Sequence, residues 1–465
     1  MKKKFLIFVT MLVLTSVFVV PAAANQSASD VPTAIAQSSE RTQCSEENIA
    51  ALEGKQFIFN VVGDLSGPYA FISQPLRAGL EDAAAYFNEQ EGGICGAEIV
   101  INPRDTGGSQ DVMREAWDEI TNADTPPEMM FLFGSADAEL VREDAINQQI
   151  PILLSAGSEL ALYGENGDAP AYTFAIIPLY TDQLGAFCQY ISENWESFGI
   201  EGDPVIGHLS WEGAFGRSTD TPETRAYCES LGVGYAGAEY FLPTTSDVST
   251  QVDTLVESGA NIIFTTSLAS GPANIAAAIA GLELQGQVLL AGVNWVLDTS
   301  VIGLGGADTQ GITGVLPYLW WDNLDNPGIQ VVNNSWAVNR FLPAGDDPDA
   351  QRAALAQRNI AYLLSFPVID AYIEVMTRTI NRVGAENLNG QAVYETLNEF
   401  QYDAMNGILR FSYSDTVRAV QVTQIGQIQF VQTDAGVNPT IVSLTDWFAT
   451  PDLKAGGADV PAMEE

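Results

Sequence analysis

The sequence predicts an α/β protein that contains two doubly wound parallel sheets. Its first structured stretch reads as a strand, a loop, a helix and a second strand, which is the unit that opens a parallel sheet. Apolar runs then alternate with helical patterns along most of the chain, as they do in parallel sheets covered on both faces. These runs are too numerous for one compact sheet. About 420 residues remain after residues 1–43 are set aside, so we expect two domains.

The opening strand is expected at residues 57–62, and the loop 63–68 follows it. A helix of about 18 residues comes next, and Gly92 and Gly93 end it. The second strand is expected at 97–101. The loop lacks a Gly-x-Gly-x-x-Gly pattern and the chain has no Gly-Lys-Ser/Thr, so the sequence indicates no nucleotide phosphate site.

Further strands continue the alternation, with helical patterns between most of them. They are expected at 129–134, 150–156, 173–177, 204–209, 261–266, 287–292 and 311–317. After the last of these the pattern changes. Residues 347–383 read as a long helical stretch that Pro367 should kink or break. Residues 407–431 read as antiparallel strands with a turn at 425–427, and 446–465 as a flexible tail.

The N-terminus has the pattern of a secretory signal. A lysine-rich start precedes a short apolar run, and small residues end at Ala24 before a polar residue. We expect cleavage after Ala24, a flexible segment at 25–52, and a soluble product in the periplasm or outside the cell. No cysteine lies next to the expected cleavage site, so a lipid anchor is not indicated.

Charge excludes one class of partner. Loss of residues 1–24 removes three lysines and no acidic residue, so the net charge changes from −40 to −43. Nucleic acids and anionic membranes need clustered Lys and Arg, so we expect no nucleic-acid partner. The acidic excess is typical of a solvated surface in salty surroundings, and no Asp-x-Asp-x-Asp-Gly calcium loop is present.

The four cysteines are an even number in a chain expected to be exported, which favours disulfides over thiol chemistry. Three pairings are possible. We favour Cys44 with Cys95 and Cys188 with Cys228, because each pair falls within one expected domain.

Catalytic chemistry is poorly represented. The single histidine, His208, lies in an expected strand, where a structural role is the usual one. No Gly-x-Ser-x-Gly elbow accompanies it, and paired-histidine metal sites are impossible. We therefore expect a protein that is not an enzyme, with no cofactor and no metal, although a secreted acid hydrolase stays open as a third reading.

Binding chemistry is better represented. Ligands of open α/β sheets lie beyond the carboxyl ends of the strands. The loops there hold small hydroxyl residues opposite aromatic ones: Ser66-Gly67, Gly134-Ser135, Ala156-Gly157-Ser158, 211–215, Ser267-Leu268 and Asn294-Trp295. Ser135 precedes an expected helix, whose N-terminus favours an anion such as a carboxylate, although a helix cap is the commoner role for one serine.

These residues resemble the extracytoplasmic solute-binding proteins of ABC importers, in the Leu/Ile/Val-binding branch of the type I periplasmic-binding fold. The resemblance covers about residues 55–432. It rests on Leu65-Ser66-Gly67-Pro68, Gly79, Gly92-Gly93-Ile94, Asp105 and the stretch 151–160, in that order and spacing.

The resemblance implies two lobes joined by three crossovers near Ile177, Pro317 and Phe411. Lobe 1 would comprise 53–176 and 318–410, and lobe 2 would comprise 177–317 and 411–445.

It also implies roles for individual residues. Ser135 would bind the carboxylate of an amino acid, with help from Ala156 and Ser158. Phe215 would face the ligand, and Ile72 and Phe366 would line its side-chain pocket. The candidate ligand-binding residues are Ser66, Ile72, Gly134, Ser135, Ala156, Gly157, Ser158, Phe215, Ser267, Asn294, Trp295 and Phe366.

Two departures from the family pattern concern the ligand's ammonium group. Asn294 stands where an acidic residue usually pairs with it, and Ser267 stands where an aromatic residue lies near it; Asp298 is a possible substitute for the acid. A neutral amide forms a weaker bond to an ammonium than a carboxylate does, by about 1–2 kcal/mol. A carboxylate without an amine, an amide or another small polar or aromatic compound is therefore a credible ligand.

We expect a monomeric solute-binding protein that delivers a small organic molecule to the membrane permease of an ABC importer. The alternative is a ligand sensor of the same fold that signals to a receptor. A neighbouring permease and ATPase gene pair would separate the two.

Overall fold

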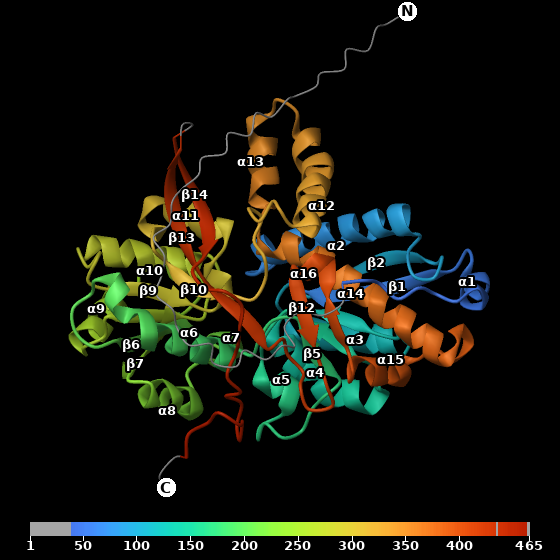
Figure 1. Cartoon of the computed structure of the whole chain (residues 1–465), viewed down its shortest axis with the longest axis horizontal. Coiled ribbons are helices and arrows are strands. Elements are labelled where there is room, and N and C mark those ends of the chain that lie inside the picture. Colours follow the sequence, from blue (N-terminus) through green and yellow to red (C-terminus); the bar gives the residue numbers. More distant parts are fainter. Residues whose placement is uncertain (1–38, 434–435, 463–465) are drawn as a thin grey trace, which may run out of the picture. The chain divides into compact units, whose positions relative to one another are not determined.

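The computed structural model describes residues 39–433 and 436–462. The expected signal sequence, 1–24, lies outside them. The described chain forms two lobes, each with its own sheet, and Figure 1 shows the first sheet on the right and the second on the left. This confirms the predicted α/β class with two doubly wound sheets.

The sheet of the first lobe has the strand order β2-β1-β3-β4-β5, and all its pairs are parallel. Its strands are β1 (Gln56–Gly63), β2 (Glu98–Asp105), β3 (Met130–Leu132), β4 (Ile152–Leu154) and β5 (Thr173–Ala175). The connecting helices are α2 (Ala70–Glu91), α3 (Gln110–Thr121), α4 (Ser135–Gln148) and α5 (Glu159–Tyr163). Gly92 ends α2 in a left-handed conformation with φ 74°, as its sequence predicted.

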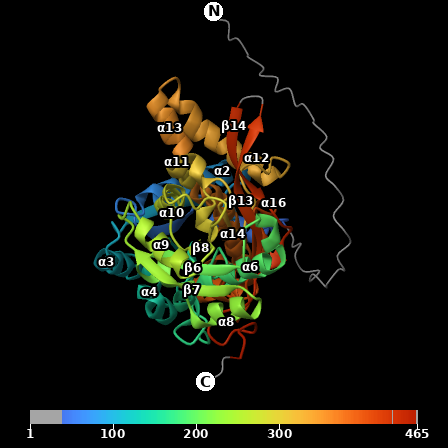
Figure 2. The same cartoon turned by 90° about the vertical axis from the view of Figure 1, so that its left-hand side faces the viewer.

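The sheet of the second lobe repeats this order as β7-β6-β8-β9-β10, again parallel, and adds β13 and β14 antiparallel beside β10. Its strands are β6 (Val205–Trp211), β7 (Gly234–Phe241), β8 (Ile262–Thr265), β9 (Leu289–Gly292), β10 (Thr313–Leu316), β13 (Val422–Thr433) and β14 (Gly436–Ser443). Its helices are α6 (Tyr180–Asn194), α7 (Ala214–Arg217), α8 (Pro222–Ser230), α9 (Ser249–Glu257), α10 (Ser270–Gly281) and α11 (Thr299–Gly305). In Figure 2, α9 and α10 lie on one side of these strands and α6 lies on the other.

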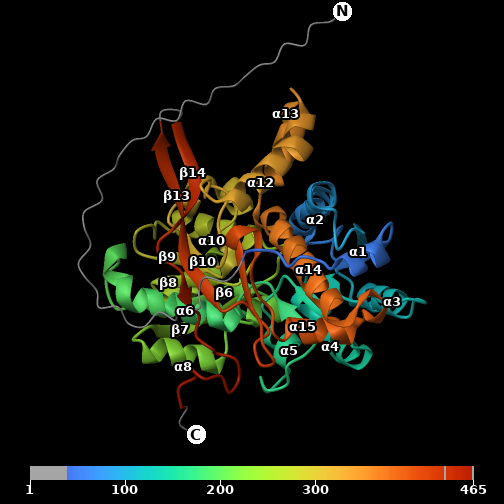
Figure 3. The same ribbon diagram turned by 45° about the vertical axis from the view of Figure 1, so that its right-hand side comes forward.

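The remaining α-helices and strands follow β10 or precede β1. They are α1 (Glu46–Leu52), α12 (Pro327–Trp336), α13 (Pro348–Ala356), α14 (Ile360–Val383), α15 (Gly390–Leu397), β11 (Gln401–Asp403), α16 (Ala404–Gly407), β12 (Leu409–Ser412) and β15 (Phe448–Ala449). Helix α14 packs along α2 of the first lobe (Figure 3). The chain therefore passes between the lobes three times: after β5, after β10 and after β12.

The long helical stretch breaks at a different place from the one its proline suggested. Pro367 lies inside α14, and the break falls before Asn359. The Asn359 side chain accepts hydrogen bonds from the N–H groups of Ala361 and Tyr362, which makes it a helix cap. In the part of the chain that the structure covers, α14 is the one helix long and apolar enough to cross a membrane, and its apolar window is wholly buried in the protein.

The turn expected at 425–427 is wrong. Strand β13 runs through Gly426, which pairs with Gly314 of β10. A side chain on Gly426 would come within 2.8 Å of Leu297 and 3.1 Å of Leu316. This glycine therefore allows close packing against the neighbouring strand and forms no turn.

Residues 39–52 and 446–462 are held in place, which differs from the flexibility expected for 25–52 and 446–465; residues 25–38 and 463–465 lie outside the described part of the chain. Arg41 forms ion pairs with Glu91 and the buried Asp370, and α1 follows shortly after. At the other end, Leu453 is fully buried, and its N–H donates to Asp182. Specific partners far away in sequence fix both segments, and no local pattern reveals them.

Both favoured disulfides are present. Cys44 pairs with Cys95 across 51 residues, and Cys188 pairs with Cys228 across 40 residues. The first fastens the N-terminal segment to the first lobe. The second joins α6 to α8 within the second lobe.

Candidate functional site

A cavity of about 300 Å³ lies at the carboxyl ends of strands from both sheets. Asp64 follows β1, Gly134 follows β3 and Ala156 follows β4, and all three line it. From the second lobe, Glu212 follows β6 and Trp295 follows β9. In each sheet the first strand lies between the two that follow it, and doubly wound sheets bind ligands at such switch points.

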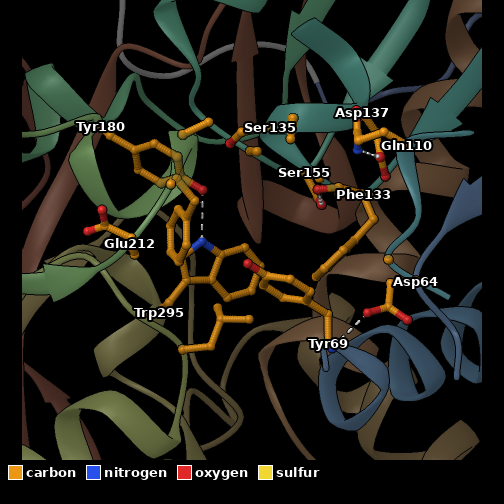
Figure 4. A pocket seen from close by; sticks show the side chains of 18 residues that line it. Asp64, Tyr69, Gln110, Phe133, Ser135, Asp137, Ser155, Tyr180, Glu212 and Trp295 are labelled. Carbon is orange, nitrogen blue, oxygen red and sulfur yellow. Dashed lines mark hydrogen bonds between the residues drawn. The ribbon is translucent and has the colours of Figure 1, made fainter. Parts of the chain in front are cut away.

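Five aromatic rings form much of the wall, and they come from both lobes (Figure 4). Phe133 lies edge-on to Tyr69 at 6.5 Å and to Trp295 at 6.3 Å between ring centroids. Tyr180 and Phe215 are 5.2 Å apart. The Trp295 indole N–H donates to the Tyr180 hydroxyl over 3.1 Å, so these rings are fixed in orientation before any ligand arrives.

Ser135 is the first residue of α4, and its buried hydroxyl makes no hydrogen bond of ordinary geometry in the structure. Buried hydroxyls are usually paired, so this one is available to a ligand. The neighbouring Ser155 also lines the cavity, but its hydroxyl already donates to the Phe133 carbonyl over 2.8 Å.

Three carboxylates line the cavity, and they differ in what they already bind. Asp64 accepts the N–H groups of Gly67 and Tyr69 and so shapes the loop after β1. Glu212, at the exposed rim, pairs with Arg217 over 3.0 Å. Asp137 accepts one hydrogen bond, 2.7 Å long, from the side-chain amide of Gln110.

The pKa of Asp137 is raised to about 6: burial is the main cause, the hydrogen bond from Gln110 lowers it, and the charge of Asp64 raises it. Burial also raises the pKa of Tyr69, and so do the charges of Asp64 and Asp137. The first-lobe side of the cavity therefore holds two carboxyl groups, and the buried one, Asp137, ionises at a higher pH than a free aspartate.

The residues that line the cavity include no histidine and no cysteine. No three His, Cys, Asp or Glu side chains in the described chain are placed to hold a metal ion. His208 lies within β6, fully buried, and its Nε2 lies 2.8 Å from the Thr219 hydroxyl. Burial lowers the pKa of His208 to about 4, so the ring is neutral at neutral pH.

The structure brings together five of the predicted binding residues at the cavity. These are Gly134, Ser135, Ala156, Phe215 and Trp295. All five follow a strand at its carboxyl end, which is the signal that selected them.

The other seven predicted residues do not line it. Ile72 and Phe366 lie in the core of the first lobe, where Phe366 packs against Tyr86 and Tyr362. Ser66 is exposed in the loop after β1. Two others have different roles: Ser158 caps α5 and donates to Glu139, and Gly157 packs against the backbone of Pro178.

Asn294 and Ser267, the two departures from the family pattern, are also outside the lining. The Ser267 hydroxyl bonds to that of Thr265 at 2.7 Å. The side-chain amide of Asn294 is fully buried without a hydrogen-bond partner among the described residues. Asp298, the possible substitute, caps α11 and accepts the N–H of Ile360.

Sequence reasoning missed most of the polar floor and part of the aromatic wall. The missed polar and aromatic residues are Asp64, Tyr69, Gln110, Phe133, Asp137, Ser155 and Tyr180. Asp64 lies in the very loop that was examined, and Asp137 is two residues past Ser135. A search for acidic residues next to the strand-end loops would have found both.

Comparisons with known proteins agree with this architecture. Residues 60–436 match the family model described as periplasmic binding protein, so the chain belongs to the periplasmic binding protein family. Curated protein sequences give no match.

Several solved structures resemble it. A branched chain amino acid ABC transporter protein from Thermus thermophilus with bound valine is 15% identical, with 86% of this chain and 98% of that chain covered and a TM-score of 0.71. A fatty acid ABC transporter substrate-binding protein from Thermomonospora curvata is 17% identical, with coverages of 88% and 95% and a TM-score of 0.65. A solute binding protein of an ABC transporter from Rhodopseudomonas palustris HaA2, in complex with p-hydroxybenzoic acid, is 15% identical, with coverages of 85% and 98% and a TM-score of 0.65. At these identities the likeness establishes the type I periplasmic-binding fold.

Proposed function

We propose that this protein is exported, captures a small organic solute in the cavity between its lobes and delivers it to the permease of an ABC importer. One observation carries the proposal: loops from the carboxyl ends of both sheets line a single cavity. A solute bound there contacts both lobes at once.

The mechanism follows from that geometry. The proposed lobes are 53–176 with 318–410, and 177–317 with 411–445, and three crossing segments join them. A solute that bridges the lobes has more contacts when they are closed, so it stabilises the closed state by its differential affinity. The permease then distinguishes the loaded protein from the unloaded one.

We propose an amino acid or a related carboxylate or amide as the solute. The free hydroxyl of Ser135 and the N-terminus of the 14-residue helix α4 are suited to a polar oxygen of the ligand. The aromatic wall is suited to an apolar body. Valine and p-hydroxybenzoic acid, the compounds named for two of the similar structures, are both small organic solutes that carry a carboxyl group.

We further propose that the mature chain is a monomer that begins at Asn25. The expected signal sequence and the two disulfides both fit an oxidising compartment outside the cytoplasm. N-terminal sequencing of the exported protein tests the cleavage site, and a first residue other than Asn25 would contradict it.

A blocked cavity provides the direct test of solute capture. Ala214 lines the cavity and is exposed at its rim, so Ala214→Trp fills the opening without disturbing the core. Ala353→Trp, on the exposed face of α13, is the matched control. In a thermal-shift screen with amino acids, short carboxylates and amides, at least one compound should stabilise the wild type and the control but not Ala214→Trp. Equal responses in both variants would refute capture in this cavity.

Delivery needs a separate assay. Uptake of that compound by cells that carry the permease and ATPase should depend on the wild-type protein and fail with Ala214→Trp. If binding occurs and uptake is unaffected by the protein, the sensing role is favoured.

A further inference from the structure

Asp137 is a buried carboxylate that lacks a positively charged partner. It is 8% exposed, lies in the first turn of α4 and lines the cavity. One of its oxygens accepts the 2.7 Å hydrogen bond from the neutral Gln110. None of the ion pairs in the described chain includes it.

Its surroundings make the charge costly. Two other titratable groups of the first lobe line the same cavity: Asp64, from the loop after β1, and Tyr69, just before α2. The charge of Asp64 raises the pKa of Asp137. Figure 4 shows Asp137 and Gln110 together at the upper right of the cavity, and Asp64 and Tyr69 below them on the far side of Phe133. A buried charge in such a place is normally paired.

No residue that lines the cavity can supply a positive charge to Asp137. The 18 residues that line the cavity include no Lys, Arg or His, and the nearby Arg217 is already paired with Glu212. The wall opposite is aromatic, and aromatic faces attract cations. The Ser135 hydroxyl also lines the cavity, is buried and makes no hydrogen bond of ordinary geometry, so it can accept an N–H.

We infer that the solute carries a positively charged nitrogen, which pairs with Asp137 on the first lobe while the aromatic rings enclose the rest. This inference rests on the proposed function and narrows its ligand class. Amines and amino acids fit the cavity, and a carboxylate without an amine does not. The ammonium contact then lies two residues past Ser135, on α4, and does not depend on position 294.

The net negative charge of the protein also favours a ligand with a positively charged nitrogen. The mature chain has a net charge of −43, and such a field concentrates cations near the cavity and repels anions. An amine-free carboxylate at the N-terminus of α4 would face Asp137 and Asp64 with no counter-charge from the lining. The carboxylate of an amino acid is compensated by its own ammonium group.

Two trios of compounds with a shared body test the charge. The first is phenethylamine, L-phenylalanine and 3-phenylpropionate, and the second is 3-methylbutylamine, L-leucine and 4-methylpentanoate. Calorimetric titration of the full-length mature protein should show, in at least one trio, an amine-bearing member that binds about tenfold or more tightly than the anion. Asp137→Asn should weaken that binding about tenfold or more. Asp144→Asn, on the same helix but paired with Arg114 outside the cavity, should leave the Kd within about twofold.

Each other outcome has a definite meaning. An anion that binds as tightly as the amine-bearing compounds, or an Asp137→Asn variant that unfolds cooperatively and has an unchanged Kd, overturns the inference and leaves solute capture intact. No binding by any of the six compounds at millimolar concentration also overturns it. If, in addition, no small molecule is released from the purified protein, solute capture itself fails.

Discussion

The side-chain amide of Gln110 donates a 2.7 Å hydrogen bond to Asp137, and this is the one hydrogen bond that the structure gives to that carboxylate. The bond joins the first turns of α3 and α4 at the edge of the cavity. Because an amide carries no charge, it orients the carboxylate without neutralising it. Asp137 is thus positioned for a further, charged partner, at a cost to the unliganded protein.

Because the buried charge of Asp137 is costly, a substitution that removes this charge should stabilise the unliganded protein. The pKa of Asp137 is raised from 3.8 to about 6 in the folded state, about 2 units at 1.36 kcal/mol each. A raised pKa contributes stability that is complete below the unfolded value and is lost as the pH rises through 6. Asp137→Asn should therefore stabilise the unliganded protein by about 3 kcal/mol at pH 7.5 and by much less at pH 4. Denaturant titrations at the two pH values check this, and a variant less stable than the wild type at pH 7.5 would contradict it.

The same titration predicts how ligand affinity depends on pH. A cationic nitrogen binds the ionised form of Asp137, so protonation competes with it. The affinity of the wild type should be constant above about pH 6.5 and fall about tenfold per pH unit below about pH 5.5. Asp137→Asn should show a weak affinity without this slope. A wild-type affinity that rises on acidification would instead indicate an anionic ligand.

Substitution of Asn294 should change the affinity for the ligand only slightly. Its side chain lies outside the lining of the cavity, although its neighbour Trp295 is part of it. We expect Asn294→Ala to change the Kd by less than about threefold, whereas Trp295→Ala should weaken binding by about tenfold or more through loss of an aromatic face. Titration of both variants with the same compound decides the point. A larger effect of Asn294→Ala would restore position 294 as the ammonium contact.

The C-terminal segment should contribute to stability. Leu453 is fully buried, its N–H donates to Asp182, and Ala455 donates to Glu159 nearby. Leu453→Ala should lower the free energy of unfolding by about 2–5 kcal/mol, as for other buried leucines. Leu355→Ala, at an exposed position on α13, is the control, with an expected change within about 0.5 kcal/mol. If Leu453→Ala lowers the free energy of unfolding no more than the control does, the segment is not held as the structure shows.

The sequence predicted the fold well because strands of a parallel sheet are buried on both faces and therefore read as continuous apolar runs. The runs at 57–62 and 129–134 are apolar since both faces of the first sheet are covered, and the structure places β1 and β3 there. Strand β7 escaped notice because it lies at a sheet edge, is half-exposed and contains two glycines. Gly426 was misread because a glycine that permits close packing looks the same in sequence as one that forms a turn.

The candidate site was only partly predictable from the sequence, because some of its residues are placed by packing between distant segments. Strand-end loops converge by topology alone, which is why Ser135 and Ala156 were found. Which face of a helix meets a cavity depends on packing between distant segments. Phe366 was expected in the pocket, yet α14 turns it into the core against Tyr86, while Tyr180 at the start of α6 reaches the cavity.

Mass spectrometry of the small molecules released when freshly purified protein is denatured tests the central claim most directly. Wild type and Ala214→Trp are compared after identical purification and exposure to the same cell extract. We predict one small molecule with a basic nitrogen, close to one per protein chain, from the wild type and little or none from the variant. The same molecule in equal amounts from both proteins, or a nitrogen-free anion from the wild type, would contradict the account.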